Sequence, residues 1–165
     1  MKNTYKKADL ENNCKIELEH IQLEIVSQRG QHLRHFIDQY FCYKHEYVTR
    51  TCKPAWGKIF WKEYVSIEAI NSGKDVIKEH IVPLNVLKQM LLDLGSKVEI
   101  KDISDLLDEY VCFATITKEE DNKLNKSGLK SKMPEICYDN GKLKKNFEKL
   151  SRYNHVQIKI NYTGR

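Results

Sequence analysis

Two short segments of the sequence carry residues that could perform chemistry together. The first is Glu79-His80, an acid and a histidine in a β-branched run that ends at Pro83. The second is residues 111–122, in which an apolar run passes directly into an acidic stretch ending with Asp121 and Asn122. If the two segments pair, an imidazole and two carboxylates converge. Such a set suits a hard divalent cation and phosphodiester chemistry.

Strand and helix patterns surround both segments. Residues 76–83 predict a short strand. Pro83 suits its end, because a proline has no backbone N–H to donate to a neighbouring strand. Residues 110–117 predict a second strand. Thr117 followed by Glu120 is a capping-box pattern, which predicts a helix running to about residue 125. Because neighbouring strand residues point to opposite faces, His80 should reach a substrate from one face while its acidic neighbour meets the helix on the other.

The remaining segments predict mainly helices. Residues 1–13 read as a loose polar start, and residues 14–28 fit a strand or a helix. Helical spacing and caps predict further helices over residues 31–47, from 56 to the turn at 71–73, over 85–94, and after Ser104. Beyond the acidic helix, the sequence predicts a basic loop over 126–134, a turn at 140–141, a basic helix over 143–150 and an extended segment over 156–160.

The acid-histidine segment resembles a known family. Glu79-His80-Ile81-Val82-Pro83 resembles the acid-His-Ile-x-Pro segment of HNH (ββα-metal) nucleases, and residues 111–122 resemble their second strand and metal helix. The resemblance implies a DNA endonuclease that uses a divalent metal, Mg²⁺ or Mn²⁺. It implies that Glu79 and Asp121 are the metal ligands and that His80 is the general base.

The flanks are also similar to short, uncharacterised phage and bacterial proteins. These proteins share an EHVVP-like segment, an ITKEED-like segment and a basic loop after it. This second resemblance does not assign an activity.

The expected architecture is a single α+β domain, mainly helical, with a small antiparallel sheet that carries a ββα-metal-like motif. Its parts are a helical N-terminal part, the motif and a basic C-terminal part, over residues 1–74, 75–127 and 128–165. The chain departs from the HNH pattern in its long connection between the two strands, in having Asp121 where histidine is common, and in lacking a clear middle asparagine ahead of Val111.

Positive charge gathers in the C-terminal third. The net charge is +5, and residues 118–152 hold ten Lys or Arg against six Asp or Glu. A polyanion would feel this field, although solvated lysines kept for solubility explain the charge equally well. The residues expected to contact nucleic acid phosphates are Lys123, Lys126, Lys130, Lys132 and Arg152.

Composition excludes several classes of protein. Apolar residues make up 41% of the chain, too many for a disordered protein. No apolar run approaches the roughly 20 residues that a membrane span needs. The basic, polar N-terminus has no apolar stretch of a signal peptide behind it. The five cysteines include no C-x-x-C pair, so a cytoplasmic protein with reduced thiols is expected.

Two alternatives to the nuclease stay open. One is a non-catalytic protein on a nuclease-like scaffold that binds nucleic acid or a protein partner, such as a phage-encoded inhibitor of a host defence complex. The other is a plain helical interaction domain. In that case His80 is a buried histidine, and Glu119 and Glu120 are first-turn acids that complement a helix dipole.

Overall fold

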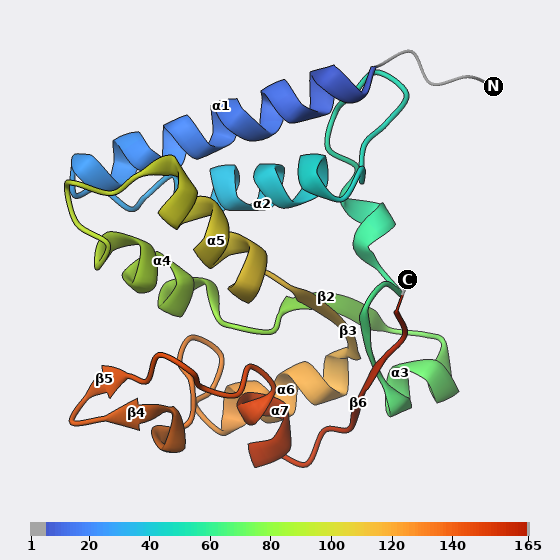
Figure 1. Ribbon diagram of the computed structural model, residues 1–165. Helices are drawn as coiled ribbons and strands as arrows, with labels where there is room; N and C mark the ends of the chain where they lie inside the picture. Colours follow the sequence, from blue (N-terminus) through green and yellow to red (C-terminus); the bar gives the residue numbers. More distant parts are fainter. Residues whose placement is uncertain (1–5, 165) are drawn as a thin grey trace. The chain divides into compact units, whose positions relative to one another are not determined.

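The computed structural model describes residues 6–164, and the chain divides into two compact units (Figure 1). Unit 1 consists of Met1–Ile59 and Leu87–Val111, and unit 2 consists of Phe60–Val86 and Cys112–Arg165. The chain therefore passes between the units three times, and neither unit is a continuous stretch. The single domain expected from the sequence stays a prediction.

Unit 1 is helical. Its long helix α1 (Lys7–Val26) packs against α2 (Leu33–Lys44) and α5 (Ile100–Tyr110). Apolar residues at helical spacing meet in its core, among them the fully buried Ile21, Ile25, Leu33 and Ile37. The predicted helix over 31–47 is thus confirmed. The predicted loose start is wrong from Lys7 onward, since α1 begins there and Asp9 accepts a hydrogen bond from the Lys6 backbone at 2.6 Å.

Unit 2 contains a four-stranded sheet in the order β2-β3-β1-β6. The strands are β1 (Tyr64–Ser66), β2 (Val76–His80), β3 (Phe113–Thr117) and β6 (Ile160–Tyr162). Strands β2 and β3 pair in antiparallel fashion, as expected, but β1 lies parallel to β3. The α+β class holds, while the sheet is mixed and not purely antiparallel.

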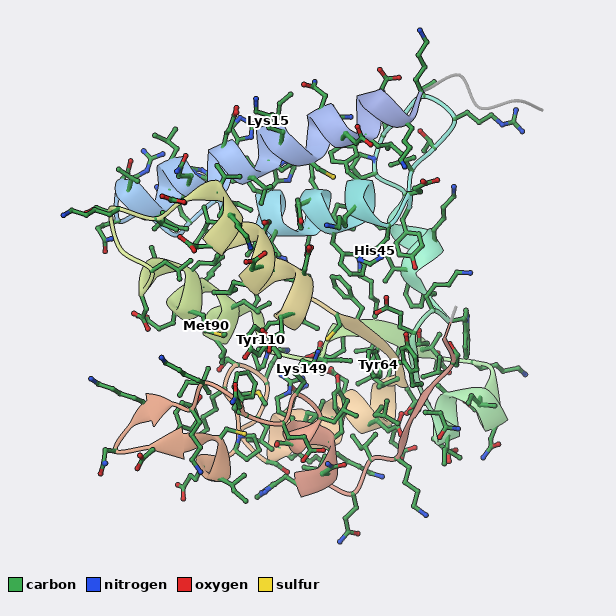
Figure 2. All side chains as sticks on the ribbon, in the orientation of Figure 1. Lys15, His45, Tyr64, Met90, Tyr110 and Lys149 are labelled. Carbon is green, nitrogen blue, oxygen red and sulfur yellow. The ribbon has the colours of Figure 1, made fainter. Side chains whose placement is uncertain are left out.

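The predicted helix from residue 56 to the turn at 71–73 is wrong. The segment forms the short helix η1 (Trp56–Ile59), then β1, then α3 (Ile67–Ser72). Trp61 and Glu63 have positive φ angles of 64° and 46°, which no helix accommodates. Tyr64, labelled in Figure 2, lies in β1, which pairs with strands on both sides. The centroid of its ring is 5.1 Å from that of Tyr162 in β6. Long-range strand pairing therefore outweighs the helical spacing.

The last forty residues also differ from expectation. The predicted basic helix over 143–150 is wrong, because residues 144–150 contain turns and no helix. Before them, β4 (Tyr138–Asp139) and β5 (Lys142–Leu143) form a hairpin. Asn140 and Gly141 have φ angles of 48° and 77°, the conformation that a tight hairpin turn requires. The helix in this region is α7 (Ser151–His155), and strand β6 begins only at Ile160.

The other elements follow the expected order. Helix α4 (Leu84–Leu92) lies close to the predicted helix, and α6 (Lys118–Lys126) begins where the capping box predicts. Helix α5 begins four residues before Ser104 and takes in Tyr110, which was expected in a strand. The turn η2 (Glu135–Cys137) precedes the hairpin. Among residues 6–164, no helix combines the length and the apolar character needed to cross a membrane.

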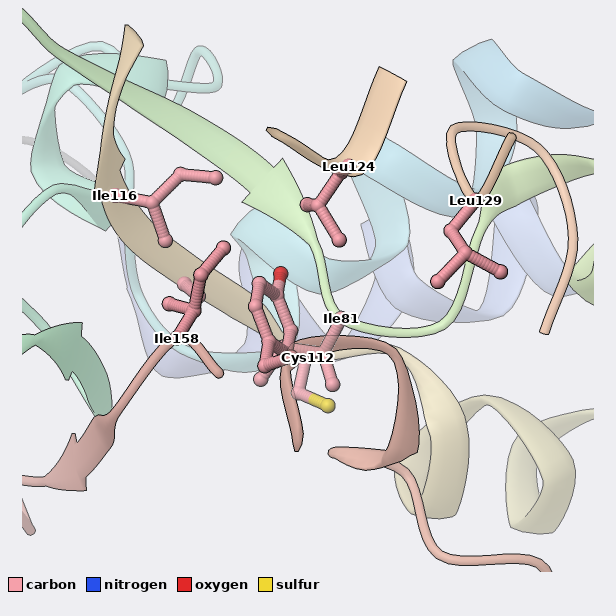
Figure 3. Packing of buried hydrophobic residues seen from close by; sticks show 8 residues of the cluster. Ile81, Cys112, Ile116, Leu124, Leu129 and Ile158 are labelled. Atoms are coloured by element: carbon pink, nitrogen blue, oxygen red, sulfur yellow. The ribbon is translucent and has the colours of Figure 1, made fainter. Parts of the chain in front are cut away.

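The core of unit 2 lies between the sheet and the two helices α6 and α7. Side chains from segments far apart in the sequence gather there, six of which are labelled in Figure 3: Ile81, Cys112, Ile116, Leu124, Leu129 and Ile158. Leu124 comes from α6 and the fully buried Tyr153 comes from α7. This packing fixes both helices on one face of the β2–β3 pair.

Candidate functional site

The β2–β3 pair and α6 form the frame of the candidate site. In the antiparallel register, Glu79 lies opposite Ala114 and His80 lies opposite Phe113. Helix α6 follows β3 without a loop, because Thr117 ends the strand and caps the helix, and α6 contacts both strands. The chain order strand, strand, helix is therefore also an arrangement in space.

Glu79 and His80 point to opposite faces of the sheet. His80 shares a face with its partner Phe113, and the two ring centroids are 4.2 Å apart. Glu79 shares the other face with Ala114 and Ile116, which pack in the core beneath α6. The division of faces expected from the alternation of a strand is thus present. His80 as a whole residue is half-buried, and its Nδ1 is a buried atom.

The carboxylate of Glu79 forms an ion pair. One guanidinium N–H of Arg152 donates to Glu79 Oε1 at 2.7 Å. The Arg152 side chain has no exposed surface, whereas 21% of the Glu79 side chain is exposed. An ion pair of this length with a buried guanidinium is a charge-assisted hydrogen bond in a region of low dielectric.

Arg152 makes two further bonds. It donates to the backbone carbonyl of His80 and to that of Lys130, each at 3.3 Å. One side chain thus ties the end of β2 to the basic loop. The sequence placed Arg152 on a nucleic acid surface, but in the structure it lies in the interior of unit 2 and its guanidinium engages protein groups.

Asp121, the second expected metal ligand, lies in the first turn of α6 and is partly exposed. Its Oδ2 accepts a hydrogen bond of 3.1 Å from Asn125, one turn further on. The register places Val76, not Glu79, opposite Thr117, the residue that caps α6.

The donor set fits a divalent cation only in part. Carboxylate oxygens are the ligands that Mg²⁺ and Mn²⁺ prefer. However, one oxygen of Glu79 is bound by Arg152. Within residues 6–164, no three His, Cys, Asp or Glu side chains are grouped as a metal ion requires.

Glu120 has a structural role. Its Oε2 accepts hydrogen bonds from the Ser66 hydroxyl at 2.6 Å, the Thr117 backbone at 2.9 Å and the Thr117 hydroxyl at 3.3 Å. The expected capping box is confirmed, with an added link to β1 that the sequence did not indicate. The side chain is buried and accepts these three bonds, so Glu120 organises the start of α6.

The four loop and helix lysines expected to contact phosphates are exposed: Lys123, Lys126, Lys130 and Lys132. Leu129 and Met133 in the same segment are buried and anchor the basic loop on unit 2. Lys123 also lines a polar hollow of about 380 Å³ with Glu119 and Lys159. The four exposed ammonium groups therefore stand on a helix and a loop that buried residues hold in place.

Lys78 is a residue that the sequence reasoning missed. It lies two positions before His80 on the same face of β2, and its Nζ is 5.1 Å from the Phe113 ring centroid. The same aromatic ring therefore positions an ammonium and an imidazole. The alternation of strand side chains was the signal that could have identified it.

The cysteine nearest to this frame has no nucleophilic role. Burial raises the pKa of Cys112 to about 12, although Lys149 opposes the shift. Its thiol is therefore protonated at neutral pH, and the thiolate that covalent chemistry requires is absent. The chemistry of the site must come from the imidazole, the carboxylates and the cationic side chains.

Comparison with known proteins gives no relative. No protein family, curated protein or solved structure matches this chain.

Proposed function

We propose that this protein is a divalent-metal-dependent endonuclease of the HNH kind that hydrolyses DNA phosphodiester bonds. The supporting observation is the β2–β3–α6 frame, in which an acid-histidine pair ends the first strand and a helix with acidic residues follows the second. His80 acts as the general base, and Glu79 and Asp121 act as ligands of Mg²⁺ or Mn²⁺. The exposed lysines Lys123, Lys126, Lys130 and Lys132 hold the DNA backbone.

The chemistry assigns a distinct step to each group. The neutral imidazole of His80 removes a proton from water, and the resulting hydroxide attacks the phosphorus as the bond to the 3′ oxygen breaks. When bound, the divalent ion offsets the negative charge that builds on the phosphate and the leaving oxygen. The Phe113 ring packs against the imidazole, and Lys78 on the same face would supply a positive charge to a phosphate bound there.

Plasmid cleavage tests this proposal. Wild-type protein should nick supercoiled DNA with Mg²⁺ or Mn²⁺ and should not do so with EDTA. His80→Ala should lower the rate by about 100-fold or more, since general base catalysis is worth about 10²–10⁴. The matched control is His155→Ala, which removes an exposed imidazole of α7 in the same unit and should leave the rate unchanged. Equal nicking by wild type and His80→Ala would exclude His80 as the base.

A second candidate is a binding protein on a nuclease-like scaffold that does not cleave its partner. The observation in its favour is the Glu79–Arg152 ion pair, because a guanidinium at 2.7 Å already neutralises the expected ligand. Salt-dependent binding of DNA without cleavage by any metal would support this candidate. Binding of neither DNA nor metal would leave a protein interaction domain.

A further inference from the structure

We propose that the β4–β5 hairpin enters the major groove of duplex DNA and that its lysines contact the phosphates that border the groove. The hairpin belongs to unit 2, which also contains the candidate site. The inference rests on the proposed function in one respect, because it takes DNA as the partner. It adds the element that grips the duplex, and this binding requires neither a metal ion nor a catalytic step.

The hairpin concentrates positive charge on its second strand and on the turn that follows. Lys142, Lys144 and Lys145 are exposed. Together with Asp139 they line an open hollow of about 530 Å³. Asp139 lies opposite Lys142 in the register and offsets one charge, so residues 139–146 carry a net charge of +2. A polyanion is therefore attracted to this end of the hairpin.

The shape of the hairpin fits the major groove of B-form DNA. Its two strands are antiparallel, and the two residues Asn140 and Gly141 join them. Paired strands lie about 4.8 Å apart, so a two-stranded ribbon with its side chains can enter a major groove that is about 12 Å wide. The major groove of A-form RNA is too narrow for side chains to read. The hairpin therefore favours duplex DNA over duplex RNA.

Hydrogen bonds fix the inner end of the hairpin, while its tip faces solvent. The Tyr138 hydroxyl accepts a hydrogen bond of 3.3 Å from the Met133 backbone, and the Lys144 backbone donates to the Cys137 carbonyl at 2.9 Å. Met133 and Cys137 are buried. The two turn residues are exposed, and the tip extends away from α6 (Figure 1). A hairpin that is already ordered enters a groove without paying a large entropy cost.

The basic loop adjoins the hairpin, because the bond between Met133 and Tyr138 joins the two segments. The loop contributes further exposed lysines, among them Lys130 and Lys132. Contacts to phosphates position a protein on DNA, whereas contacts to base edges in the groove read the sequence. Asn140 at the tip has a side chain of the type that bonds the edge of adenine. The lysines therefore position the duplex, and Asn140 is the residue placed to contact a base.

Fluorescence anisotropy of a short labelled DNA duplex, titrated with the full chain in EDTA, tests the inference. EDTA removes divalent metal, so binding is measured without cleavage. The triple variant with Lys142→Gln, Lys144→Gln and Lys145→Gln should bind about 100-fold more weakly than wild type at about 0.1 M salt. The slope of its log affinity against log salt should be smaller by about 2–3, because each phosphate contact contributes about 0.9.

The matched control removes the same charge from unit 1. It combines Lys7→Gln, Lys15→Gln and Lys97→Gln, three substitutions at exposed positions. Its affinity for the duplex should stay within about threefold of wild type, because solvent and salt screen charges that do not contact the DNA.

A second pair of variants tests entry of the tip itself. Asn140→Asp keeps a residue that tolerates the left-handed turn, since Asp-Gly suits this hairpin as Asn-Gly does. The new carboxylate should weaken binding of duplex DNA by about tenfold, the loss expected when one base contact is removed. Asn12→Asp, at an exposed position of α1, makes the same change of charge and should stay within about twofold of wild type.

One lysine of the triple variant also has an internal contact. Lys144 Nζ donates to the Ile136 carbonyl at 2.9 Å, so Lys144→Gln removes a hydrogen bond within the hairpin region. The double variant with Lys142→Gln and Lys145→Gln keeps this bond. Should the triple variant fail to fold, the double variant should still bind duplex DNA at least about tenfold more weakly than wild type.

The outcomes separate this inference from the proposed function. Affinity equal to wild type in the folded hairpin variants, or equal binding of duplex RNA and duplex DNA, would refute groove entry and leave the nuclease with the lysines of the basic loop. Weaker binding by the hairpin variants, with no nicking by wild type in Mg²⁺ or Mn²⁺, would refute the nuclease and support the hairpin contact. Absence of DNA binding by wild type at low salt would overturn the inference, while nicking with metal would still decide the nuclease.

Discussion

Ion pairs in this chain differ in how far their charges are removed from water. Arg152 is fully buried against Glu79, whereas Lys101 and Asp105 pair on the surface of α5 with side chains 78% and 61% exposed. Exposed ion pairs contribute about 0–1 kcal/mol to the free energy of unfolding. Removal of one partner of a buried pair costs more, because it leaves an uncompensated charge in the interior. Burial, not the mere presence of an ion pair, therefore decides the contribution to stability.

This difference predicts the effect of single substitutions. Arg152→Met should lower the free energy of unfolding by about 2–4 kcal/mol, because Glu79 loses its counter-ion and two carbonyls lose a donor. Lys101→Met should change it by less than about 0.5 kcal/mol. Urea denaturation at pH 7 measures both values. A double variant with Glu79→Gln should recover part of the loss, and a small cost for Arg152→Met would show that the pair contributes little.

At the scale of elements, α6 depends on a single buried carboxylate at its start. Glu120 bonds its own helix cap at Thr117 and the β1 residue Ser66. Glu120→Ala should cost about 2–4 kcal/mol, since one capping interaction and one cross-link to the sheet are lost and buried donors are left unpaired. Glu119→Ala, at the exposed neighbouring position, is the matched control and should cost less than about 0.5 kcal/mol. Chemical denaturation distinguishes the two, and similar losses would contradict a specific role for Glu120.

The joint between α1 and α2 contains a pH-dependent contact. Burial by itself would raise the pKa of Glu24, but hydrogen bonds from Arg29 and His32 outweigh it and lower that pKa below its ordinary value of 4.5. Arg29 donates to Glu24 Oε1 at 2.8 Å. A carboxyl whose folded pKa is lowered adds stability above its unfolded pKa and loses that contribution as the pH falls through its folded pKa.

Glu24→Gln should therefore lower stability by about 1–2 kcal/mol at pH 7. The difference from wild type should persist down to about pH 4.5 and shrink at lower pH as the native carboxylate becomes protonated. Urea unfolding at a series of pH values measures this. Glu19→Gln, which alters an exposed pair with Lys15, should show a much smaller difference at every pH. If the difference in stability between Glu24→Gln and wild type grew on acidification, it would contradict this prediction.

Local patterns predicted some elements and missed others for a physical reason. The capping box of α6 and the helical spacing of α2 lie within a few residues, so both could be predicted. Strand β1 has helical spacing, and what makes it a strand is its pairing with β3 and β6, about fifty and a hundred residues away. The candidate site also combines a local pattern with a long-range contact. The acid-histidine pair consists of adjacent residues and could be found in the sequence. Arg152, the partner of Glu79, lies 73 residues further along the chain and has no sequence signature.

At the scale of the whole molecule, the net charge belongs to one unit. Unit 1 contains 13 Lys or Arg and 13 Asp or Glu, so its net charge is zero. Unit 2 contains 15 Lys or Arg and 10 Asp or Glu, so it carries the entire net charge of +5. Unit 2 also contains the acid-histidine pair, α6 and the basic loop. A polyanionic partner would therefore be drawn to the unit that holds the candidate site, in either of the two proposed functions.

Thermal unfolding separates these two functions. A ligand that binds only the folded chain stabilises it by about 2.7 kcal/mol at 100 times its dissociation constant, which shifts the melting temperature by several degrees. The nuclease should melt at a higher temperature in Mg²⁺ or Mn²⁺ than in EDTA, and Asp121→Asn should reduce that shift. Asp75→Asn, which changes an exposed acid outside the ligand set, should retain it. A shift caused by short duplex DNA at low salt, with none caused by metal, would instead indicate the binding protein, because charge attraction alone needs no divalent ion.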